Sequence, residues 1–325
     1  MKQVCGSWRC LFLGMVVVLM MLIAVPGLTA EKFPDKQVTV IDPWPAGGRS
    51  DLSTRIIAAV LEKNLGQPVV VVNKAGAGGY IGLKAAATSK PDGYTLGIAG
   101  ASFLLYQYTG ESKIRLEEFK WVGQSYYAAF TVSVHAESPW KTLEEFLDYA
   151  KKHPGELKHG TSGYGVVAHV LSEGFAKAAG IKLHQIHYKG DAPSVIALAS
   201  KELDVNTAPL GSLRSLIEAG KVRVLALQAD KRSPQYPNVP TLKEKGIDWT
   251  AGSFEGFVAP KDTPDEIIAV LDKAMQKSIV DPGIAEKFMK MDFLVEPRNQ
   301  KEWTAYIEKQ DKILQGLLKE MGIIK

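Results

Sequence analysis

A strand, a Pro/Gly-rich loop and a helix follow one another near the start of the sequence, and this unit constrains the fold more than any other feature. The apolar run Val38-Thr-Val-Ile41 predicts a buried strand. The loop Asp42-Pro-Trp-Pro-Ala-Gly-Gly-Arg49 follows, and Ser50-Asp51 is a suitable N-cap for a helix over 51–64. Such a loop directs backbone N–H groups and the positive end of a helix dipole at one small volume. The unit therefore predicts an anion-binding site.

Strands and helices are predicted to alternate along most of the chain. The predicted strands cover 38–41, 69–72, 95–99, 121–123, 131–134, 157–159, 184–188, 204–207 and 222–228, and the predicted helices 51–64, 80–87, 142–152, 165–179, 192–200, 211–219, 264–279, 283–289 and 301–321. Such alternation is typical of βαβ units and predicts an α/β fold with mostly parallel sheets flanked by helices. A chain of 325 residues favours two domains of roughly 100–200 residues each.

The first 30 residues are predicted to be a secretory signal peptide rather than part of the fold. Lys2 and Arg9 form a basic start, 11–25 is an uncharged apolar run of 15 residues, and a small residue, Ala30, precedes the expected cut. The run is short for a membrane span. Leu28 is a poor residue at the third position before a cut, so an uncleaved anchor stays open as an alternative.

The rest of the chain, 31–325, is close to neutral and has no cysteine. Cys5 and Cys10 both precede the apolar run, so disulfides, thiol catalysis and cysteine metal sites are excluded from the mature chain. Removing Lys2 and Arg9 leaves 37 Lys and Arg residues against 35 Asp and Glu residues. Binding of nucleic acid needs concentrated basic residues, so this balance argues against a nucleic acid partner.

A second strand-loop-helix unit repeats the first. The strand Val69-Val-Val-Val-Asn73 leads into Lys74-Ala-Gly-Ala-Gly-Gly79 and then into a helix. Its glycines allow close backbone approach and positive φ values. The spacing departs from the dinucleotide motif G-x-G-x-x-G, and no Gly-Lys-Ser/Thr of a P-loop follows, so no nucleotide cofactor is expected. The loop either faces a ligand or is a tight turn that packs the helix on the sheet.

A third unit, Gly160-Thr-Ser-Gly-Tyr-Gly-Val-Val-Ala-His169, combines two hydroxyls with bare backbone before another helix. Ser162 and His169 raise the alternative of an exported Ser/His hydrolase, but the second glycine of G-x-S-x-G is missing. His169 is therefore interpreted as a hydrogen-bonding residue of the helix. His184 and His187 are three apart on a predicted strand and face opposite sides, which makes a poor metal pair. No catalytic residue and no metal site are expected.

Four further residues near these loops each admit two interpretations. Lys189 either attracts an anion or is an exposed cation at a loop, and Trp44 either forms an apolar wall over a ligand or covers a core edge. Asp51 is interpreted first as a helix cap, because capping spreads its charge onto N–H groups and lets a carboxylate lie beside an anion site. Asp204 caps or ends a strand.

Several short runs occur in an order that identifies a family. They are Pro43-Trp-Pro-Ala-Gly-Gly-Arg-Ser-Asp51, Leu65-Gly-Gln-Pro68, Asn73-Lys-Ala-Gly-Ala-Gly-Gly79, Pro91-Asp-Gly-Tyr-Thr-Leu96, Gly160-Thr-Ser-Gly-Tyr-Gly165 with His169, Tyr188-Lys-Gly190, Gly220-Lys-Val-Arg-Val-Leu-Ala226, Arg232-Ser-Pro-Gln-Tyr-Pro-Asn-Val-Pro-Thr241 and Phe257-Val-Ala-Pro-Lys-Asp-Thr-Pro264. The ordered set spans residues 33–321 and resembles the solute receptors of tripartite tricarboxylate transporter (TTT) systems, the Bug-type family of periplasmic binding proteins.

The resemblance implies a two-lobed periplasmic-binding-protein fold, type II-like, in which two hinge crossovers join the lobes. We place the crossovers near 123–134 and 225–229, where apolar strands flank an internally complete block. The first lobe then comprises 31–125 and 229–325, and the second lobe comprises 126–228.

The resemblance also implies which residues hold the ligand. In the family, loops at the strand ends of both lobes hold a carboxylate through backbone N–H groups, hydroxyls and bridging waters. The corresponding positions, with their loop neighbours, are Trp44, Ala46, Gly47, Gly48, Ser50, Asp51, Ala77, Gly78 and Ser102 in the first lobe and Thr161, Ser162, Gly163, Gly165, Val166, His169, Tyr188, Lys189 and Asp204 in the second. Two positions depart from the family pattern. Val166 stands where many members carry Thr or Ser, and Glu255 where an aromatic residue or Arg is common.

The function implied by the resemblance is binding without chemistry. We expect a monomeric periplasmic receptor, with no cofactor, that captures a small carboxylate between two lobes and delivers it to the membrane permease subunits of a TTT system. Aromatic acids, citrate-like acids, dicarboxylates and acidic amino acids all fit this expectation. The alternatives are the exported Ser/His hydrolase and a ligand-sensing protein that acts on a membrane sensor partner.

Overall fold

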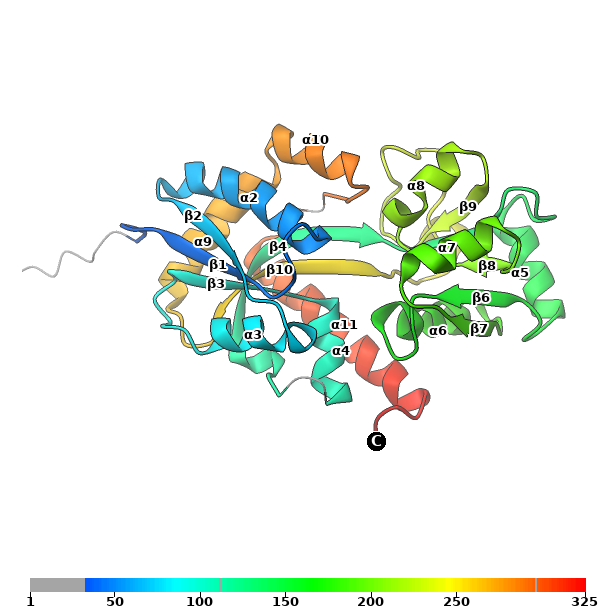
Figure 1. The fold of residues 1–325 in the computed structure, drawn as a ribbon, viewed down its shortest axis with the longest axis horizontal. Helices are drawn as coiled ribbons and strands as arrows, with labels where there is room; N and C mark the ends of the chain where they lie inside the picture. Colours follow the sequence, from blue (N-terminus) through cyan, green and yellow to red (C-terminus); the bar gives the residue numbers. More distant parts are fainter. Residues whose placement is uncertain (1–32, 111–112, 296) are drawn as a thin grey trace, which may run out of the picture.

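The computed structural model describes residues 33–110, 113–295 and 297–325. The predicted signal peptide, 1–30, lies outside these residues. Two five-stranded sheets organise the described chain, and each is the centre of one lobe (Figure 1). Within the described ranges, no helix is both long enough and apolar enough to cross a membrane.

The sheet of the first lobe has the strand order β2-β1-β3-β10-β4. Its strands are β1 (Val38–Asp42), β2 (Val69–Asn73), β3 (Thr95–Gly100), β4 (Phe119–Ala129) and β10 (Gly252–Pro260). β1 is parallel to β2 and β3, whereas β10 is antiparallel to both of its neighbours, β3 and β4. A single reversed strand in the sheet confirms the expectation of a mostly parallel sheet in this lobe.

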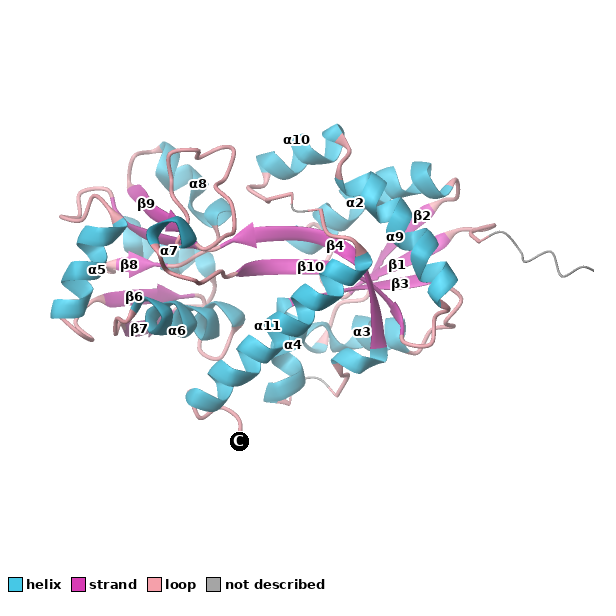
Figure 2. Ribbon diagram, turned by 180° about the vertical axis from the view of Figure 1, so that it is seen from behind, coloured by secondary structure: helices cyan, strands magenta, loops and turns pink. Residues whose placement is uncertain are grey.

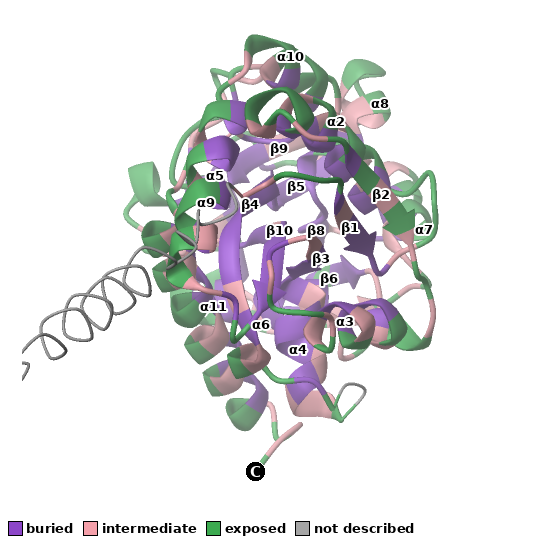
Figure 3. Cartoon of the chain, turned by 90° about the vertical axis from the view of Figure 1, so that its left-hand side faces the viewer, coloured by how far each residue is buried: buried purple, intermediate pink, exposed green. Residues whose placement is uncertain are grey.

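The sheet of the second lobe repeats this pattern in the order β7-β6-β8-β5-β9. Its strands are β5 (Thr131–His135), β6 (Lys158–Thr161), β7 (His184–His187), β8 (Val205–Asn206) and β9 (Val222–Leu227). β6 is parallel to β7 and β8, and β5 is the strand that runs antiparallel to its neighbours. Figure 3 shows the strands of both sheets buried beneath helices whose outer faces are exposed.

Helices cover both faces of the first sheet (Figure 2). The helices α2 (Arg49–Leu65), α9 (Asp265–Ile279) and α10 (Pro282–Lys290) lie on one face, and α3 (Tyr80–Ala87), α4 (Ala101–Thr109) and α11 (Gln300–Glu320) on the other. Successive residues of a strand therefore enter different cores: Val122 packs with α2 and α9, while Trp121 packs with α4 and α11. This two-sided burial explains why the strands read as apolar runs in the sequence.

The second sheet is covered in the same way. One face packs against α5 (Leu143–Lys152) and α6 (Val167–Ala179), and the other against α7 (Asp191–Ala199) and α8 (Leu210–Glu218). α5 begins at a capping box in which Thr142 accepts the Glu145 amide and the Glu145 side chain accepts the Thr142 amide.

Two neighbouring stretches of chain join the lobes. β4 and β5 are separated only by Phe130, whose amide donates to the Ala251 carbonyl and whose carbonyl accepts the Gln228 amide. The outward and return crossovers are therefore hydrogen-bonded to each other. Residues of α6 also join the core cluster of α4 and α11, so apolar contacts continue from one lobe to the other. The boundaries after 125 and 228 stay predictions.

Two elements of the first lobe were not predicted. α4 carries Phe, Leu and Tyr side chains in the sequence ASFLLYQYT, a composition that does not distinguish a short buried helix from a strand. β10 contains Gly252, Glu255 and Gly256, which interrupt an apolar run. β4 was predicted only over 121–123, although it extends to Ala129.

Candidate functional site

The strand order places a crevice at the same edge of each sheet. β1 has β2 on one side and β3 on the other, and β6 lies likewise between β7 and β8. Chain connections from such a central strand diverge, which leaves a crevice at the carboxyl ends of the strands. The loops 43–48 and 74–79 leave this edge in the first lobe, and 162–166 and 188–190 leave it in the second. These loops contain most of the predicted ligand-binding residues.

The first loop is held by Asp51, but not as the predicted N-cap. α2 begins at Arg49, with Gly48 as its N-cap and no side-chain cap. The Asp51 carboxylate instead accepts the Gly47 amide, Arg55 Nε and Asn73 Nδ2, each at 2.9 Å. The prediction of a cap at Ser50-Asp51 is therefore wrong, because both side chains bind groups outside the first turn.

The hydrogen bonds of Asp51 control its charge. Burial alone would raise the pKa of Asp51, but the bonds from Arg55, Gly47 and Asn73 outweigh burial and hold the pKa below its usual value. The carboxylate is thus charged, and its oxygens face protein donors. Asp51 shapes the loop from inside the first lobe while the backbone of Ala46, Gly47 and Gly48 stays exposed.

A second carboxylate lies beneath the same loop. Asp42 ends β1, is fully buried, and accepts the Trp44 amide at 2.9 Å and the Ser50 hydroxyl at 2.9 Å. Burial raises the pKa of Asp42, and the charge of Asp51 adds to the rise. Ser50 is thereby directed into the lobe and supports the loop through Asp42.

Three predicted residues that follow three different strands line one small cavity. Trp44 follows β1, Gly78 follows β2 and Ser102 follows β3, and all three border a space of about 20 Å³. Such a space is enough for about one water molecule. The same cavity is lined by Ser253 and Glu255 of β10, which the sequence did not place at the site. The cavity lies where the crevice of the first sheet is expected, at the ends of β1 and β3.

In the second lobe, histidines support the glycine loop. His169 Nδ1 accepts the Gly165 amide at 3.1 Å, and His187 Nδ1 lies 2.7 Å from the Thr161 hydroxyl. The exposed Tyr164 ring packs on both histidine rings. Burial lowers the pKa of His169 to about 4, so the ring is neutral at pH 7 and accepts a hydrogen bond. His169 thus has the hydrogen-bonding role that the sequence predicted.

The remaining residues of that loop are arranged by backbone contacts. The Ser162 carbonyl accepts the Gly190 amide at 2.9 Å, which ties the loop after β6 to the loop after β7. In the described part of the chain, no hydrogen bond joins Ser162 to His169. Val166 is the N-cap of α6 and provides no side-chain cap, so amides of the first turn have no acceptor from that side chain. Gly163 contributes bare backbone, and a Cβ added there would lie 3.3 Å from Val166.

Tyr188 and Asp204 make their contacts away from this arrangement, whereas Lys189 lies on the loop 188–190 at its edge. Tyr188 donates its hydroxyl to Glu202 at 2.9 Å, within the second lobe. Lys189 is exposed at the loop between β7 and α7. Asp204 accepts the Lys158 amide at 2.8 Å, and both residues lie at the amino ends of β8 and β6. Asp204 therefore lies at the edge of the sheet opposite the glycine loop.

A charge pair shows that the two loop edges face each other. Arg49 begins α2 in the first lobe, Asp191 begins α7 in the second, and Arg49 Nη2 lies 4.0 Å from Asp191 Oδ2. Neither residue was among the predicted ligand-binding residues. The sequence signal for Arg49 was its place within Gly-Gly-Arg-Ser-Asp, where a cation beside exposed amides adds to the attraction of anions.

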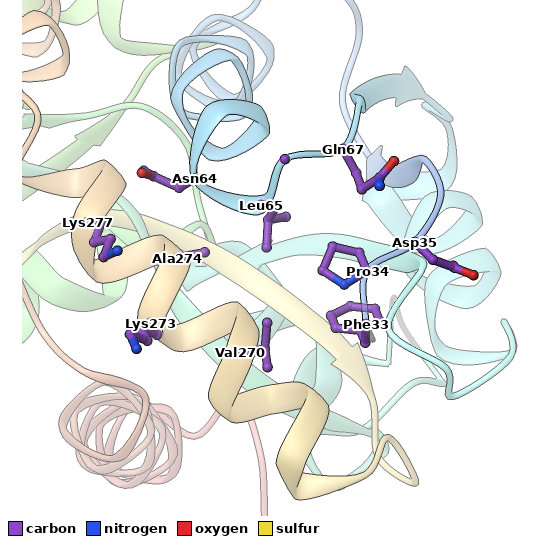
Figure 4. Close-up of a pocket in the computed structure, with 11 residues that line it drawn as sticks. Phe33, Pro34, Asp35, Asn64, Leu65, Gln67, Val270, Lys273, Ala274 and Lys277 are labelled. Carbon is purple, nitrogen blue, oxygen red and sulfur yellow. The ribbon is translucent and has the colours of Figure 1, made fainter. Parts of the chain in front are cut away.

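A second, open depression lies at the other end of α2. It has a volume of about 820 Å³ and contains none of the predicted residues. Figure 4 shows Asn64 and Leu65 on one side of it and Val270, Lys273 and Lys277 of α9 on the other. With 17 residues, α2 separates this depression from the glycine loops by about 25 Å. Within the described ranges, no group of three or more His, Cys, Asp or Glu side chains is placed to hold a metal ion.

Comparison with known sequences identifies relatives over nearly the whole chain. A family model described as the tripartite tricarboxylate transporter family receptor, TctC, matches residues 53–323. The UPF0065 protein of the gbd 5′ region from Cupriavidus necator is 33% identical over 299 residues, 91% of this chain and 90% of that protein. Protein BugT from Bordetella pertussis is 32% identical over 273 residues, 82% of this chain and 83% of BugT.

Solved structures share the two-lobed fold. A TctC solute-binding protein from Polaromonas, solved without ligand, has a TM-score of 0.83 at 29% identity and covers 89% of this chain and 99% of its own. An R. palustris protein solved with adipate has a TM-score of 0.70 at 27% identity, with 90% and 99% covered. MatC from Rhodopseudomonas palustris, solved with malate, has a TM-score of 0.65 at 25% identity, with 88% and 100% covered. The Polaromonas neighbour is a solute-binding protein. The chain belongs to the tripartite tricarboxylate transporter receptor family, the Bug-type solute-binding proteins of the periplasm.

Proposed function

We propose that this protein is an exported periplasmic receptor that captures a small carboxylate between its two lobes and delivers it to a TTT membrane permease. One observation carries the proposal. Two loop edges, each at the carboxyl end of a mostly parallel sheet, face each other where Arg49 contacts Asp191. Solved family members with adipate and malate support a carboxylate as the ligand class.

Backbone amides supply the binding energy in this proposal. The exposed loop 46–48 and the first turn of α2 offer N–H groups, and the glycine loop before α6 offers more from the second lobe. Charge-assisted hydrogen bonds contribute roughly 1.5–3 kcal/mol each before ordering costs are subtracted. Four or five such bonds with apolar packing against Trp44 are consistent with micromolar affinity, about −8 kcal/mol.

Entry of the ligand requires the lobes to separate. Arg49 and Asp191 lie 4.0 Å apart across the two loop edges, so the lobes are in contact at the proposed site. The hydrogen-bonded crossovers at Phe130, Gln228 and Ala251 are the proposed hinge. Closure around the ligand excludes water and strengthens each amide contact. The closed form is the shape that the permease recognises.

The ligand class is tested by thermal shift with a panel of mono-, di- and tricarboxylic acids, aromatic acids, acidic amino acids and uncharged sugars. The expected result is a rise in Tm with at least one carboxylate and none with the sugars. A rise with non-carboxylate solutes alone would disprove the proposed class.

The site is tested by adding side chains to both loops. Gly48→Val together with Gly163→Val introduces Cβ atoms 3.3 Å from Pro45 and from Val166 and should abolish the carboxylate-induced rise in Tm. The matched control is Gly316→Val on α11, where an added Cβ meets no atom within 4 Å. The control should keep the rise. Retained binding in the double variant would place the ligand elsewhere.

Export, oligomeric state and delivery need separate measurements. Mass spectrometry of the periplasmic fraction should find a chain that lacks about 30 residues at its start, as a cleaved signal peptide requires. Light scattering of the purified receptor should give the mass of a monomer. Uptake of a labelled acid by cells that express the permease should require this chain, whereas action on a sensor would leave uptake unchanged.

A further inference from the structure

Glu255 is a buried acid at the edge of the proposed ligand site. It lies on β10, its side chain is 8% exposed, and its Oε2 atom is buried without a hydrogen-bond partner. It lines the same small cavity as Trp44, Gly78 and Ser102. A buried carboxylate oxygen without a partner is costly in a folded protein, so its retention at this place needs a reason.

The approach of β10 to β3 brings Glu255 to the cavity. Glu255 pairs with Gly100, the last residue of β3, in the antiparallel register. A Cβ at Gly100 would lie 2.1 Å from the Phe254 carbonyl oxygen and 2.7 Å from Glu255 Cγ. Only glycine at this position allows the two strands to pair with the Glu255 side chain in between. The acid is thus part of the architecture of the first lobe.

The groups around Glu255 come from four elements. Asp42 on β1 opposes its charge, while Arg49 and Ser50 on α2 and the Trp44 side chain favour it. Tyr126 on β4 is its register partner, and Glu255 raises the pKa of that tyrosine further above its usual value. Among these groups Asp42 is fully buried, whereas the Arg49 side chain is 37% exposed and faces Asp191. Arg49 is therefore a weak counter-ion for a charge at Glu255.

Two neighbouring buried carboxyl groups cannot both be ionised without a large cost in free energy. Burial raises the pKa of Glu255 to about 8, and the charge of Asp42 adds to the rise against the opposing effects of Ser50, Arg49 and Trp44. Glu255 is consequently a neutral acid at pH 7. A neutral carboxylic acid carries one O–H donor, which an ionised carboxylate lacks.

We propose that Glu255 is a specificity-determining residue of the carboxylate site, where its side chain donates a hydrogen bond to the carboxylate of the ligand. This inference rests on the proposed function. An ionised Glu255 in the same place would repel the ligand. The receptor therefore binds its ligand only in the form that keeps this proton, and a site otherwise made of backbone amides acquires a side-chain donor particular to this chain.

The proposal fixes how affinity depends on pH. With a pKa of about 8 in the free receptor, roughly nine-tenths of the molecules carry the proton at pH 7 and about one-tenth at pH 9. Because apparent affinity scales with the competent fraction, Kd should rise about tenfold from pH 7 to pH 9. His169, with its pKa of about 4, stays neutral across this range and does not contribute.

The test is isothermal titration calorimetry of the full mature chain at pH 7, 8 and 9 with acetate, malate and adipate, under circular dichroism control of folding. Glu255→Gln keeps an N–H donor but cannot titrate, so it should bind within about threefold of wild type at pH 7 and equally well at pH 9. Glu255→Ala removes the donor and should bind about tenfold or more weakly at pH 7. Glu266→Gln, on the exposed first turn of α9, is the matched control and should keep the wild-type pH profile.

The outcomes separate this inference from the proposed function. A wild-type Kd that is constant from pH 7 to 9 would overturn the role of Glu255 and leave carboxylate binding intact. A fall in affinity that persists in Glu255→Gln, or wild-type binding by Glu255→Ala, would do the same. Absence of binding at every pH by these three acids and by every other carboxylate of the thermal-shift panel would instead reject the proposed function, and this inference with it.

Discussion

The burial of Glu255 predicts a large and unusual dependence of stability on pH. In the unfolded chain Glu255 titrates near 4.5, whereas in the folded protein its pKa is about 8. Between these values the folded state holds a proton that the unfolded state releases, so the contribution to stability is fully present below pH 4.5 and is lost as pH rises through 8. A difference of about 3.5 in pKa corresponds to about 5 kcal/mol at 1.36 kcal/mol for each unit.

The variant Glu255→Gln isolates this contribution. Gln has nearly the same shape and no titration, so the free energy of unfolding of the variant minus that of wild type should grow by about 4 kcal/mol from pH 4.5 to pH 8.5, most of the full effect. Urea unfolding at half-unit pH steps measures both proteins. Buried histidines change stability with the opposite sign over part of this range, but they are present in both proteins and cancel in the difference.

A difference curve that is flat between pH 5 and pH 8.5 would refute the reasoning. It would mean that the folded pKa of Glu255 is ordinary, and that water or a rearranged Arg49 solvates the carboxylate. A difference that rises only between pH 3 and pH 5 would lead to the same conclusion. The protein with Glu266→Gln should show no such difference from wild type, because that residue lies on an exposed helix surface.

Three further predictions concern stability outside the site. His159 is fully buried between Gln185 and Thr207, and burial lowers its pKa to about 4. Its stabilising effect is present above pH 6.5 and is lost as pH falls through 4, which lowers the free energy of unfolding by about 3 kcal/mol. In urea unfolding, His159→Gln should therefore lose less stability than wild type when the pH is lowered from 6.5 to 4. Arg214→Met removes the 2.6 Å partner of Asp292, whose side chain is 1% exposed, and should cost about 3 kcal/mol at pH 7 in urea unfolding; an unchanged midpoint would contradict this. Thr142→Ala breaks the capping box of α5 and should lower the free energy of unfolding by about 1 kcal/mol, while a cost below about 0.3 kcal/mol would contradict the assigned cap.

Much of the fold could be predicted because burial on both sides of a parallel sheet leaves a strong pattern. The apolar runs at Val38, Val69 and Thr95, each followed by a loop and a helix, predicted β1, β2 and β3 within one or two residues. The strand β10 was not predicted from the sequence, because it is far along the chain from its partners β3 and β4 and contains glycines and an acid. Its pairing is decided by the cores that it covers, which a local pattern does not contain.

Several residues of the small cavity were predictable from glycine loops at strand ends, whereas the side-chain contacts around them were not. Glycine loops at strand ends point to the edge of a sheet from spacing alone, and Trp44, Gly78 and Ser102 do border one cavity. Asp204 was misplaced: the predicted strand 204–207 already puts it at the amino end of β8, away from the glycine loops, and only the resemblance assigned it to the ligand. Arg49 and Asp191 belong to different lobes, so their approach depends on how the lobes are set against each other.

Similarity to neighbours whose ligands are known therefore supports the class of ligand more strongly than it supports one particular ligand. Amides at helix and strand ends stabilise any compact anion, because they carry fixed dipoles and no shape of their own. In our proposal, the ionisable side chains nearest to them, Arg49, Asp191 and Glu255, set how many carboxylates the site accepts. At pH 7 Glu255 is a neutral acid, so it adds a hydrogen-bond donor to this set and no negative charge. A neighbour solved with adipate at 27% identity therefore supports the ligand class, while in our proposal these three side chains select the acid that this chain binds.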